Sequence, residues 1–201
     1  MPDRLLPDEA GLARAAQLLR DGELVAFPTD TVYGIGCGTG DPQALARLFA
    51  AKLRPPEKAV PWLVASLDEV RRLGFRADER AVRLAERFWP GALTLVLPAV
   101  EGPATQAFRV PDHAVALALL AAAGPLAVSS ANRSGEPETL DADDVAIAFA
   151  GSGEPVATLD GGRVPGGVAS SVVDLTGPRA RLIREGAMPR AEIESTIGPI
   201  D

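Results

Sequence analysis

The sequence predicts an α/β fold built on a twisted, mixed β-sheet that is flanked by helices. Segments with strand-like and helix-like patterns are interleaved along all 201 residues, which is typical of a sheet covered by helices. Several strand-like segments follow one another without a helix, so antiparallel as well as parallel pairs are expected. No internal repeat, low-complexity segment or interdomain linker is found, which predicts a single domain over residues 1–201.

The first quarter of the chain carries clear start and stop signals. Residues 8–21 predict an amphipathic helix that ends at Gly22, because apolar side chains recur there at helical spacing. The apolar run 24–29 predicts a strand, and the glycine-rich segment after it predicts a loop that contains a short strand. Asp41 and Pro42 form an N-cap and N1 pair, which predicts a helix that extends to Lys52.

The rest of the chain continues the alternation up to a short C-terminal tail. In the order of the sequence, we expect a strand at 60–66, a short helix from the capping box Ser66–Glu69, a helix at 78–88, a strand at 92–98, a helix at 112–122, a strand at 126–130, a polar loop at 131–137, a helix at 141–150, a strand at 156–160, a flexible turn, and strands at 170–176 and 179–185. The tail, residues 186–201, shows little pattern.

Composition excludes several classes of protein. A single cysteine, Cys37, and a single histidine, His113, leave no residues for a disulfide or for a zinc site of several such ligands. We therefore expect no metal held by the protein alone and Mg²⁺ that arrives with a nucleotide. A net charge of −7 disfavours bulk capture of nucleic acid. No signal peptide or membrane-spanning run is found, which predicts a cytoplasmic protein without membrane contact.

Two polar segments in the first third of the chain are candidates for a ligand site. The loop Pro28–Gly34 combines two threonines, Asp30 and the only tyrosine, and either binds a small polar substrate or forms a turn with an Asx bond. Lys52-Leu53-Arg54-Pro55, with Lys58 beyond it, offers an ammonium and a guanidinium group. These cations suit a polyphosphate, or they are the solvated cations of a helix C-terminus.

Two further polar segments follow strands in the second half. Ser129–Gly135 ends a strand in hydroxyls and an amide, which fits phosphate oxygens, a ribose or a simple serine-rich turn. Ser170–Asp174, with Arg184 on the following strand, is either part of a site or a hairpin with ordinary polar ends. Ligand crevices in α/β sheets form at such strand ends. Neither a Walker A loop nor a nucleophile elbow is found.

Seven stretches, taken together and in order, resemble the YrdC/TsaC family of threonylcarbamoyl-AMP synthases, in its short, single-domain form. They span nearly the whole chain, and they are FPTDTVYGIGC (27–37), AKLRP (51–55), FWPGALTLVL (88–97), RVPDH (109–113), SSANRSGEP (129–137), SSVVDLT (170–176) and LIREGAM (182–188). The threonine-rich loop, then K-x-R-P, then S-A-N-x-S-G is the most specific part of this pattern.

The resemblance implies a YrdC/RibB-like fold with a large concave cavity and a reaction of L-threonine, bicarbonate and ATP that gives threonylcarbamoyl-AMP and pyrophosphate. It assigns the catalytic and phosphate-binding roles to Lys52 and Arg54. Further nucleotide contacts are implied at Ser130, Asn132, Ser134 and Arg184. Threonine contacts are implied at Thr31, Tyr33, Arg109, Ser170 and Ser171. The implied partners are these small molecules and the machinery that transfers threonylcarbamoyl to tRNA, with weak RNA binding as a further expectation.

This chain departs from the family at two positions. Some relatives carry a histidine after K-x-R-P, where this chain reads PWLVAS, and the glycine common inside that motif is Leu53. Two other functions stay open: a non-enzymatic RNA-binding or ribosome-maturation factor with the same fold, and a carbamoyl-transfer module of hydrogenase maturation.

Overall fold

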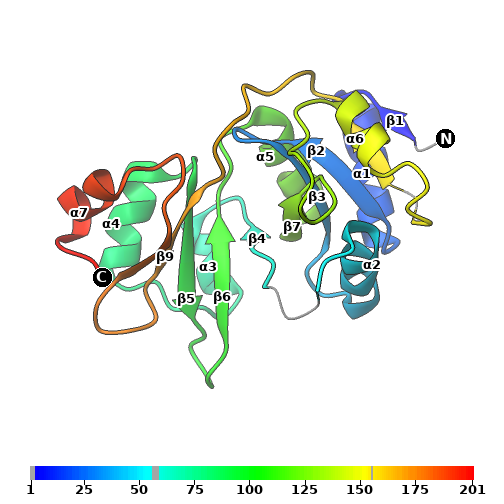
Figure 1. Ribbon diagram of the computed structural model, residues 1–201. Coiled ribbons are helices and arrows are strands. Elements are labelled where there is room, and N and C mark those ends of the chain that lie inside the picture. Colours follow the sequence, from blue (N-terminus) through cyan, green and yellow to red (C-terminus); the bar gives the residue numbers. More distant parts are fainter. Residues whose placement is uncertain (1–2, 56–58, 155) are drawn as a thin grey trace.

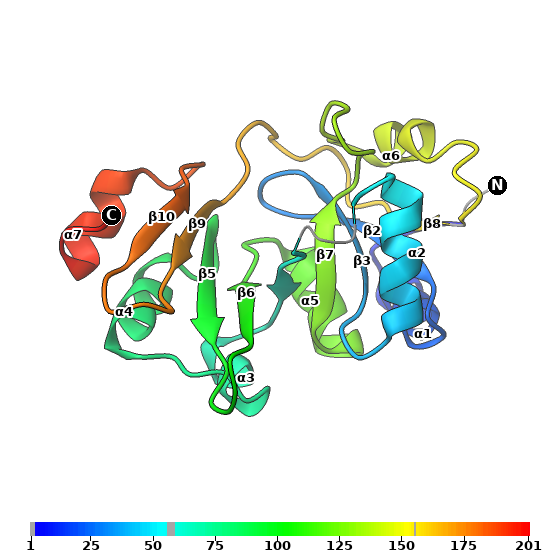
Figure 2. The same cartoon turned by 60° about the horizontal axis from the view of Figure 1, so that its bottom comes forward.

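A computed structural model describes residues 3–55, 59–154 and 156–201. Within them, ten strands form one sheet in the order β1-β8-β2-β3-β7-β4-β6-β5-β9-β10 (Figures 1 and 2). The strands are β1 (Arg4–Leu5), β2 (Leu24–Pro28), β3 (Tyr33–Gly38), β4 (Trp62–Leu63), β5 (Leu93–Pro98), β6 (Thr105–Arg109), β7 (Leu126–Ser130), β8 (Val156–Leu159), β9 (Ser171–Asp174) and β10 (Arg181–Arg184). The helices are α1 (Glu9–Arg20), α2 (Pro42–Lys52), α3 (Leu67–Arg72), α4 (Glu79–Phe88), α5 (Ala114–Ala123), α6 (Ala142–Ala148) and α7 (Arg190–Ile197).

The sheet is mixed, as the sequence predicts. β1 with β8, β2 with β8, β4 with β6 and β5 with β9 are parallel. The pairs β2–β3, β3–β7, β4–β7, β5–β6 and β9–β10 are antiparallel. The predicted α/β class is therefore confirmed. The pairs β2–β3, β5–β6 and β9–β10 are consecutive in the sequence, and the other neighbours in the sheet are not.

Side-chain caps fix where five of the helices begin. Asp8, Asp41, Ser66, Asp78 and Asp141 each accept a hydrogen bond from a backbone N–H of the first helical turn. Such caps satisfy N–H groups that have no partner inside the helix. Because these signals are local, the helices expected at 8–21, 42–52 and 78–88 lie within one residue of the observed ones.

Helices cover the two halves of the sheet differently (Figures 1 and 2). Around β2 and β3, one face packs on α1 and α5 through Val25 and Phe27, and the other packs on α2 through Tyr33 and Ile35. Around β5, β6 and β9, one face packs on α3, α4 and α7. The opposite face of that half is therefore available to line a cavity.

Three predicted segments differ from the structure. The loop after β2 contains the six-residue strand β3, while the strand expected at 60–66 shortens to Trp62–Leu63. The expectation of a tail with little pattern at 186–201 is wrong, because α7 forms there. This helix begins after Pro189 without a side-chain cap and buries Ile193 completely. Tertiary packing, which a local pattern does not record, stabilises it.

No helix in the described part of the chain has both the length and the apolar character that crossing a bilayer requires.

Candidate functional site

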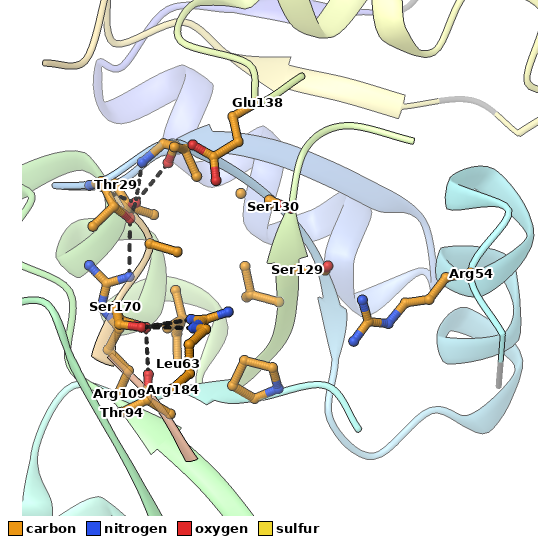
Figure 3. Close-up of a pocket in the computed structure, with 16 residues that line it drawn as sticks. Thr29, Arg54, Leu63, Thr94, Arg109, Ser129, Ser130, Glu138, Ser170 and Arg184 are labelled. Atoms are coloured by element: carbon orange, nitrogen blue, oxygen red, sulfur yellow. Dashed lines mark hydrogen bonds between the residues drawn. The ribbon is translucent and has the colours of Figure 1, made fainter. Parts of the chain in front are cut away.

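A cavity of about 220 Å³ lies along the middle of the sheet (Figure 3). Its wall follows the sheet order from β3 to β10, so the sheet curves around it. The lining residues are Thr29, Thr31, Val32, Gly34, Arg54, Pro61, Leu63, Thr94, Arg109, Val128, Ser129, Ser130, Glu138, Ala169, Ser170 and Arg184. Nine of these sixteen residues carry a hydroxyl or a guanidinium group.

The alternation of side chains along the strands of this wall decides which residues face the cavity. On β5, Leu93 and Leu95 belong to the core under α4, and Thr94 between them lines the cavity. On β6, Phe108 packs in the same core and Arg109 lines the cavity. Successive side chains of a strand point to opposite faces, so one core-forming strand also supplies one polar group to the site.

Arg109 is held by the loop between β2 and β3. Its Nη2 donates to Oδ1 of Asp30 at 2.5 Å, and its Nη1 donates to Oγ1 of Thr31 at 3.2 Å. Its Nε donates to the carbonyl of Gly91 at 2.9 Å. The side chain of Arg109 is only 9% exposed. The guanidinium orientation is therefore set by three separate contacts.

Ser170 connects two other groups of the wall. Its hydroxyl shares a hydrogen bond of 2.8 Å with Thr94, and its carbonyl accepts from Nη2 of Arg184 at 2.7 Å. Figure 3 shows these three side chains together at one end of the cavity, close to Arg109. This end therefore offers two guanidinium groups and neighbouring hydroxyls.

Arg54 lies on the opposite side of the cavity from Arg109 and Arg184 (Figure 3). It follows α2, and its Nη2 donates to the carbonyl of Ala59 at 2.9 Å. Its Nε is buried without a partner among the described residues, and burial lowers the pKa of the guanidinium. Ser129 and Ser130, at the end of β7, lie between the two ends.

The charge of the lining contrasts with that of the protein. Three arginines and one carboxylate, that of Glu138, line the cavity of a chain whose net charge is −7. Guanidinium groups bind carboxylates and phosphates through paired, charge-assisted hydrogen bonds. The cavity is therefore suited to an anionic ligand that also carries groups for the hydroxyls.

Lys52, to which the resemblance gives a phosphate-binding role, is held by the backbone next to the cavity. It is absent from the cavity wall, only 2% exposed, and its ammonium donates to the carbonyls of Ser130 and Asn132. Burial, and then the charge of Arg54, lower its pKa to about 8. The side chain joins the end of α2 to the end of β7 and to the following loop. Lys58 lies outside the described residues.

Tyr33 and Ser171 also face away from the cavity. Tyr33 belongs to the core under α2, and its hydroxyl donates to the carbonyl of Gly162 at 2.8 Å. Ser171 is fully buried, and its hydroxyl donates to the carbonyl of Met188 at 2.5 Å. Each is one residue away from a lining residue, Gly34 or Ser170. The threonine contacts implied for Tyr33 and Ser171 therefore stay predictions.

Asn132 and Ser134 belong to the loop after β7 rather than to the wall. The side-chain amide of Asn132 donates to the carbonyl of Glu136 at 2.6 Å, and its Oδ1 is buried without a partner among the described residues. Ser134 is exposed, and its backbone N–H donates to the carbonyl of Lys52 at 2.9 Å. These contacts fix the shape of the loop next to Ser130.

The structure brings together six of the residues named from the sequence and adds others. Thr31, Arg54, Arg109, Ser130, Ser170 and Arg184 all line the cavity. Thr29, Thr94, Ser129 and Glu138 line it too. Thr29, Thr94 and Ser129 lie in the stretches that carry the family resemblance. Because successive side chains of a strand point to opposite faces, the position of Thr94 between two core leucines indicates that it faces the cavity. Nothing local distinguishes Glu138 from other exposed acidic residues.

The chain is similar to proteins of one known family over most of its length. The sequence pattern of the Sua5/YciO/YrdC family, described as telomere recombination, matches residues 17–186. A threonylcarbamoyl-AMP synthase of Bacillus subtilis is 39% identical over 98% of this chain, and one of Pyrococcus abyssi is 44% identical over 92%. The crystal structure of P. abyssi Sua5 complexed with L-threonine is 40% identical and covers 100% of this chain with a TM-score of 0.90.

The chain is shorter than these relatives. It spans 60% of the B. subtilis protein and 57% of the P. abyssi protein. The matched part of the P. abyssi structure is 62% of that chain. The likeness therefore concerns the portion of each relative that contains this sheet.

Proposed function

The chain belongs to the Sua5/YciO/YrdC family, and from this premise we propose that it is an L-threonylcarbamoyladenylate synthase. Its reaction joins L-threonine, bicarbonate and ATP and releases threonylcarbamoyl-AMP and pyrophosphate. In class, this makes it a nucleotidyltransferase. Relatives that carry the name threonylcarbamoyl-AMP synthase support the proposal.

One observation of this chain carries the proposal: its cavity has guanidinium groups at two separate ends. Arg109 and Arg184 lie at one end with Thr94 and Ser170, Arg54 lies at the other, and Ser129 and Ser130 lie between them (Figure 3). An amino-acid carboxylate and a polyphosphate are two anions that must be held side by side for this reaction. Two separated cationic ends suit that pair of ligands.

Threonine is assigned to the end with the hydroxyl pair. Arg109 would bind the α-carboxylate, and Thr31 and Ser170 would accept or donate hydrogen bonds to its polar groups. Tyr33 and Ser171 contribute indirectly, because their hydroxyls join β3 to Gly162 and the start of β9 to Met188. The structure of P. abyssi Sua5 with L-threonine supports a threonine site in a relative.

The nucleotide is assigned to the other end. Arg54 would bind the phosphates, Ser130 would contact their oxygens, and Arg184 would neutralise charge between the two ligands. Lys52, Asn132 and Ser134 shape the loop beside Ser130. A cavity of about 220 Å³ is below the ~300 Å³ at which typical small-molecule sites begin, so part of the nucleotide would extend outside it.

The proposed reaction needs the substrates to be positioned, and it needs no nucleophile from the enzyme. The threonine amine and bicarbonate form an N-carboxy compound with loss of water. A carbamate oxygen then attacks the α-phosphorus of ATP, the bond from that phosphorus to the bridging oxygen breaks, and pyrophosphate leaves. Holding the reactants together and neutralising phosphate charge are the contributions expected from the arginines.

Mg²⁺ would enter with ATP as part of the substrate. Mg²⁺ is usually bound through one or two carboxylates and substrate phosphates. The described wall offers one carboxylate, from Glu138, and the described residues hold no cluster of three potential metal ligands. We therefore assign the ion to the nucleotide phosphates, with Glu138 as the protein group nearest to such a role.

The proposed product indicates which partners the protein has and where in the cell it acts. Threonylcarbamoyl-AMP is an activated acyl donor, so a tRNA threonylcarbamoyl-transfer machinery would consume it in the cytoplasm. The acidic net charge of −7 favours only weak contact with RNA itself.

The proposal is tested by omission. Purified protein is incubated with MgATP, L-threonine and bicarbonate in the presence of pyrophosphatase, and released phosphate is measured while one substrate at a time is left out. We expect phosphate only when all three are present, and mass spectrometry should show threonylcarbamoyl-AMP. Arg54→Gln should lower the rate about 10-fold or more, since a charge-assisted contact is worth ~1.5–3 kcal/mol.

The matched control for Arg54→Gln is Arg47→Gln. Arg47 lies on the neighbouring helix α2, where it pairs with Glu23, and its side chain is 41% exposed. Its replacement should leave the rate unchanged. Phosphate release without threonine or without bicarbonate would contradict the proposed reaction.

A further inference from the structure

We propose that Asp30 is a positioning residue that directs the guanidinium of Arg109 toward the α-carboxylate of the amino-acid substrate. Asp30 does not belong to the cavity wall, while Arg109 does. The inference rests on the proposed function, because it gives the pair a task in binding the amino acid. It is carried by the contacts between the loop 29–32 and Arg109.

The loop 29–32 is closed by its own first residue. The hydroxyl of Thr29 donates to the carbonyl of Val32 at 2.7 Å and accepts from the N–H of Thr31 at 3.2 Å. Thr29 and Thr31 are 3% and 5% exposed. The turn is therefore fixed from within, so the side chains of Asp30 and Thr31 reach Arg109 together.

Asp30 connects this turn to two other elements. Its Oδ1 accepts from Nη2 of Arg109 at 2.5 Å and from the backbone N–H of Asp112 at 3.1 Å. The carboxylate thus joins the loop to the end of β6 and to the segment before α5. Its side chain is 17% exposed against 9% for Arg109. A pair so well shielded from water holds its geometry more firmly than a surface pair.

The contacts leave Arg109 with donors to spare. A guanidinium has five N–H groups, and three of them have partners among the described residues: Gly91, Thr31 and Asp30. Two N–H groups remain, which is the number that a two-pronged carboxylate contact uses. Asp30 therefore fixes which donors are occupied and leaves the others for the ligand.

The experiment measures substrate dependence in Asp30→Ala and Asp30→Asn. For Asp30→Ala we expect KM for threonine to rise at least 10-fold and KM for ATP to stay within 2-fold, because only the amino-acid end loses its alignment. Asp30→Asn keeps an acceptor oxygen without the charge, so its KM for threonine should rise about 3-fold. Asp68→Ala removes the carboxylate of an exposed pair with Arg71 and is the matched control, with both KM values unchanged.

A second readout separates positioning from a general loss of structure. Threoninol has the side chain and amine of threonine but no carboxylate, so its inhibition constant should be equal in wild type and in Asp30→Ala. In an Arg109→Lys background, Asp30→Ala should add less than 2-fold to the KM for threonine, since the residue acts through Arg109. If Asp30→Ala does not fold, as judged by its melting curve, Asp30→Asn undergoes the same measurements.

The outcomes distinguish this inference from the proposed function. An active wild type with an unchanged threonine KM in Asp30→Ala and Asp30→Asn would overturn the inference and leave the synthase proposal intact. So would an equal rise in the KM of ATP and threonine, or a full and additive effect in the Arg109→Lys background. A wild type that makes no product from the three substrates would instead overturn the proposed function.

Discussion

Lys52 is a buried ammonium whose proton is bound less tightly in the folded protein than in water. Its pKa falls from 10.5 to about 8, first because burial disfavours the charge and second because Arg54 is near. Between these two values the unfolded chain binds more protons than the folded one. The cost of the buried charge is complete below pH 8, and it is relieved as the pH rises from about 8 toward 10.5.

The stability of the wild type relative to Lys52→Met should therefore depend on pH. We expect the difference in unfolding free energy to move in favour of the wild type by about 1 kcal/mol between pH 7 and pH 9. Urea unfolding at pH 7, 8 and 9 measures it. The same trend is expected against Lys52→Arg, because neither replacement titrates in this range. A difference that stays constant with pH, or that falls, would show that folding does not lower the pKa of Lys52.

Leu53 explains why a glycine suits the middle of the K-x-R-P motif. It ends α2 in the left-handed conformation, with φ of 51° and ψ of 40°, and it is 69% exposed. A side chain costs about 1–2 kcal/mol in that conformation, and glycine avoids the cost. The turn directs Arg54 away from the helix axis and toward the cavity.

The sequence predicts where several strands of the site lie better than it predicts which of their side chains face the cavity. Local patterns located β2, β5 and β7 closely and identified the polar segments at their ends, because caps, turns and apolar runs are recorded in neighbouring residues. The face that each side chain takes depends on register, and a shift of one residue exchanges the faces. The family resemblance names Tyr33, Ser170 and Ser171, and of these Ser170 lines the cavity, as does Gly34 next to Tyr33.

Helix α7 depends on contacts that no local pattern records. It packs beside α4 at the C-terminal end of the chain (Figure 2), and Ile193 is completely buried in the core under β5. Ile193→Ala should lower the unfolding free energy by about 2–5 kcal/mol through lost burial and the cavity left behind. Chemical denaturation measures the change.

The control for Ile193→Ala is the same substitution on another helix. Ile147 lies on α6 and is 76% exposed, so Ile147→Ala should change the unfolding free energy by less than about 0.5 kcal/mol. Equal effects of the two substitutions would mean that α7 does not pack as the structure shows.

The order of the strands in the sheet brings the residues of the site together. Arg54, Arg109 and Arg184 are far apart in the sequence. They line the same cavity because β7, β4, β6, β5, β9 and β10 are consecutive in the sheet. Sequence reasoning could name these residues from the family resemblance. It could not derive their convergence, since strand order depends on contacts between distant segments. Nor could it show that the ammonium of Lys52 binds the backbone carbonyls of Ser130 at the end of β7 and of Asn132 in the loop after it.

The central claim is that one cavity holds an amino acid and a nucleotide at two separate cationic ends. Isothermal titration of Arg109→Lys and Arg54→Gln with threonine and with MgATP tests it most directly. We predict a crossover: Arg109→Lys weakens threonine binding at least 10-fold and leaves ATP binding within 2-fold, while Arg54→Gln does the reverse. Equal weakening of both ligands by either variant, or no weakening by both, would contradict the claim.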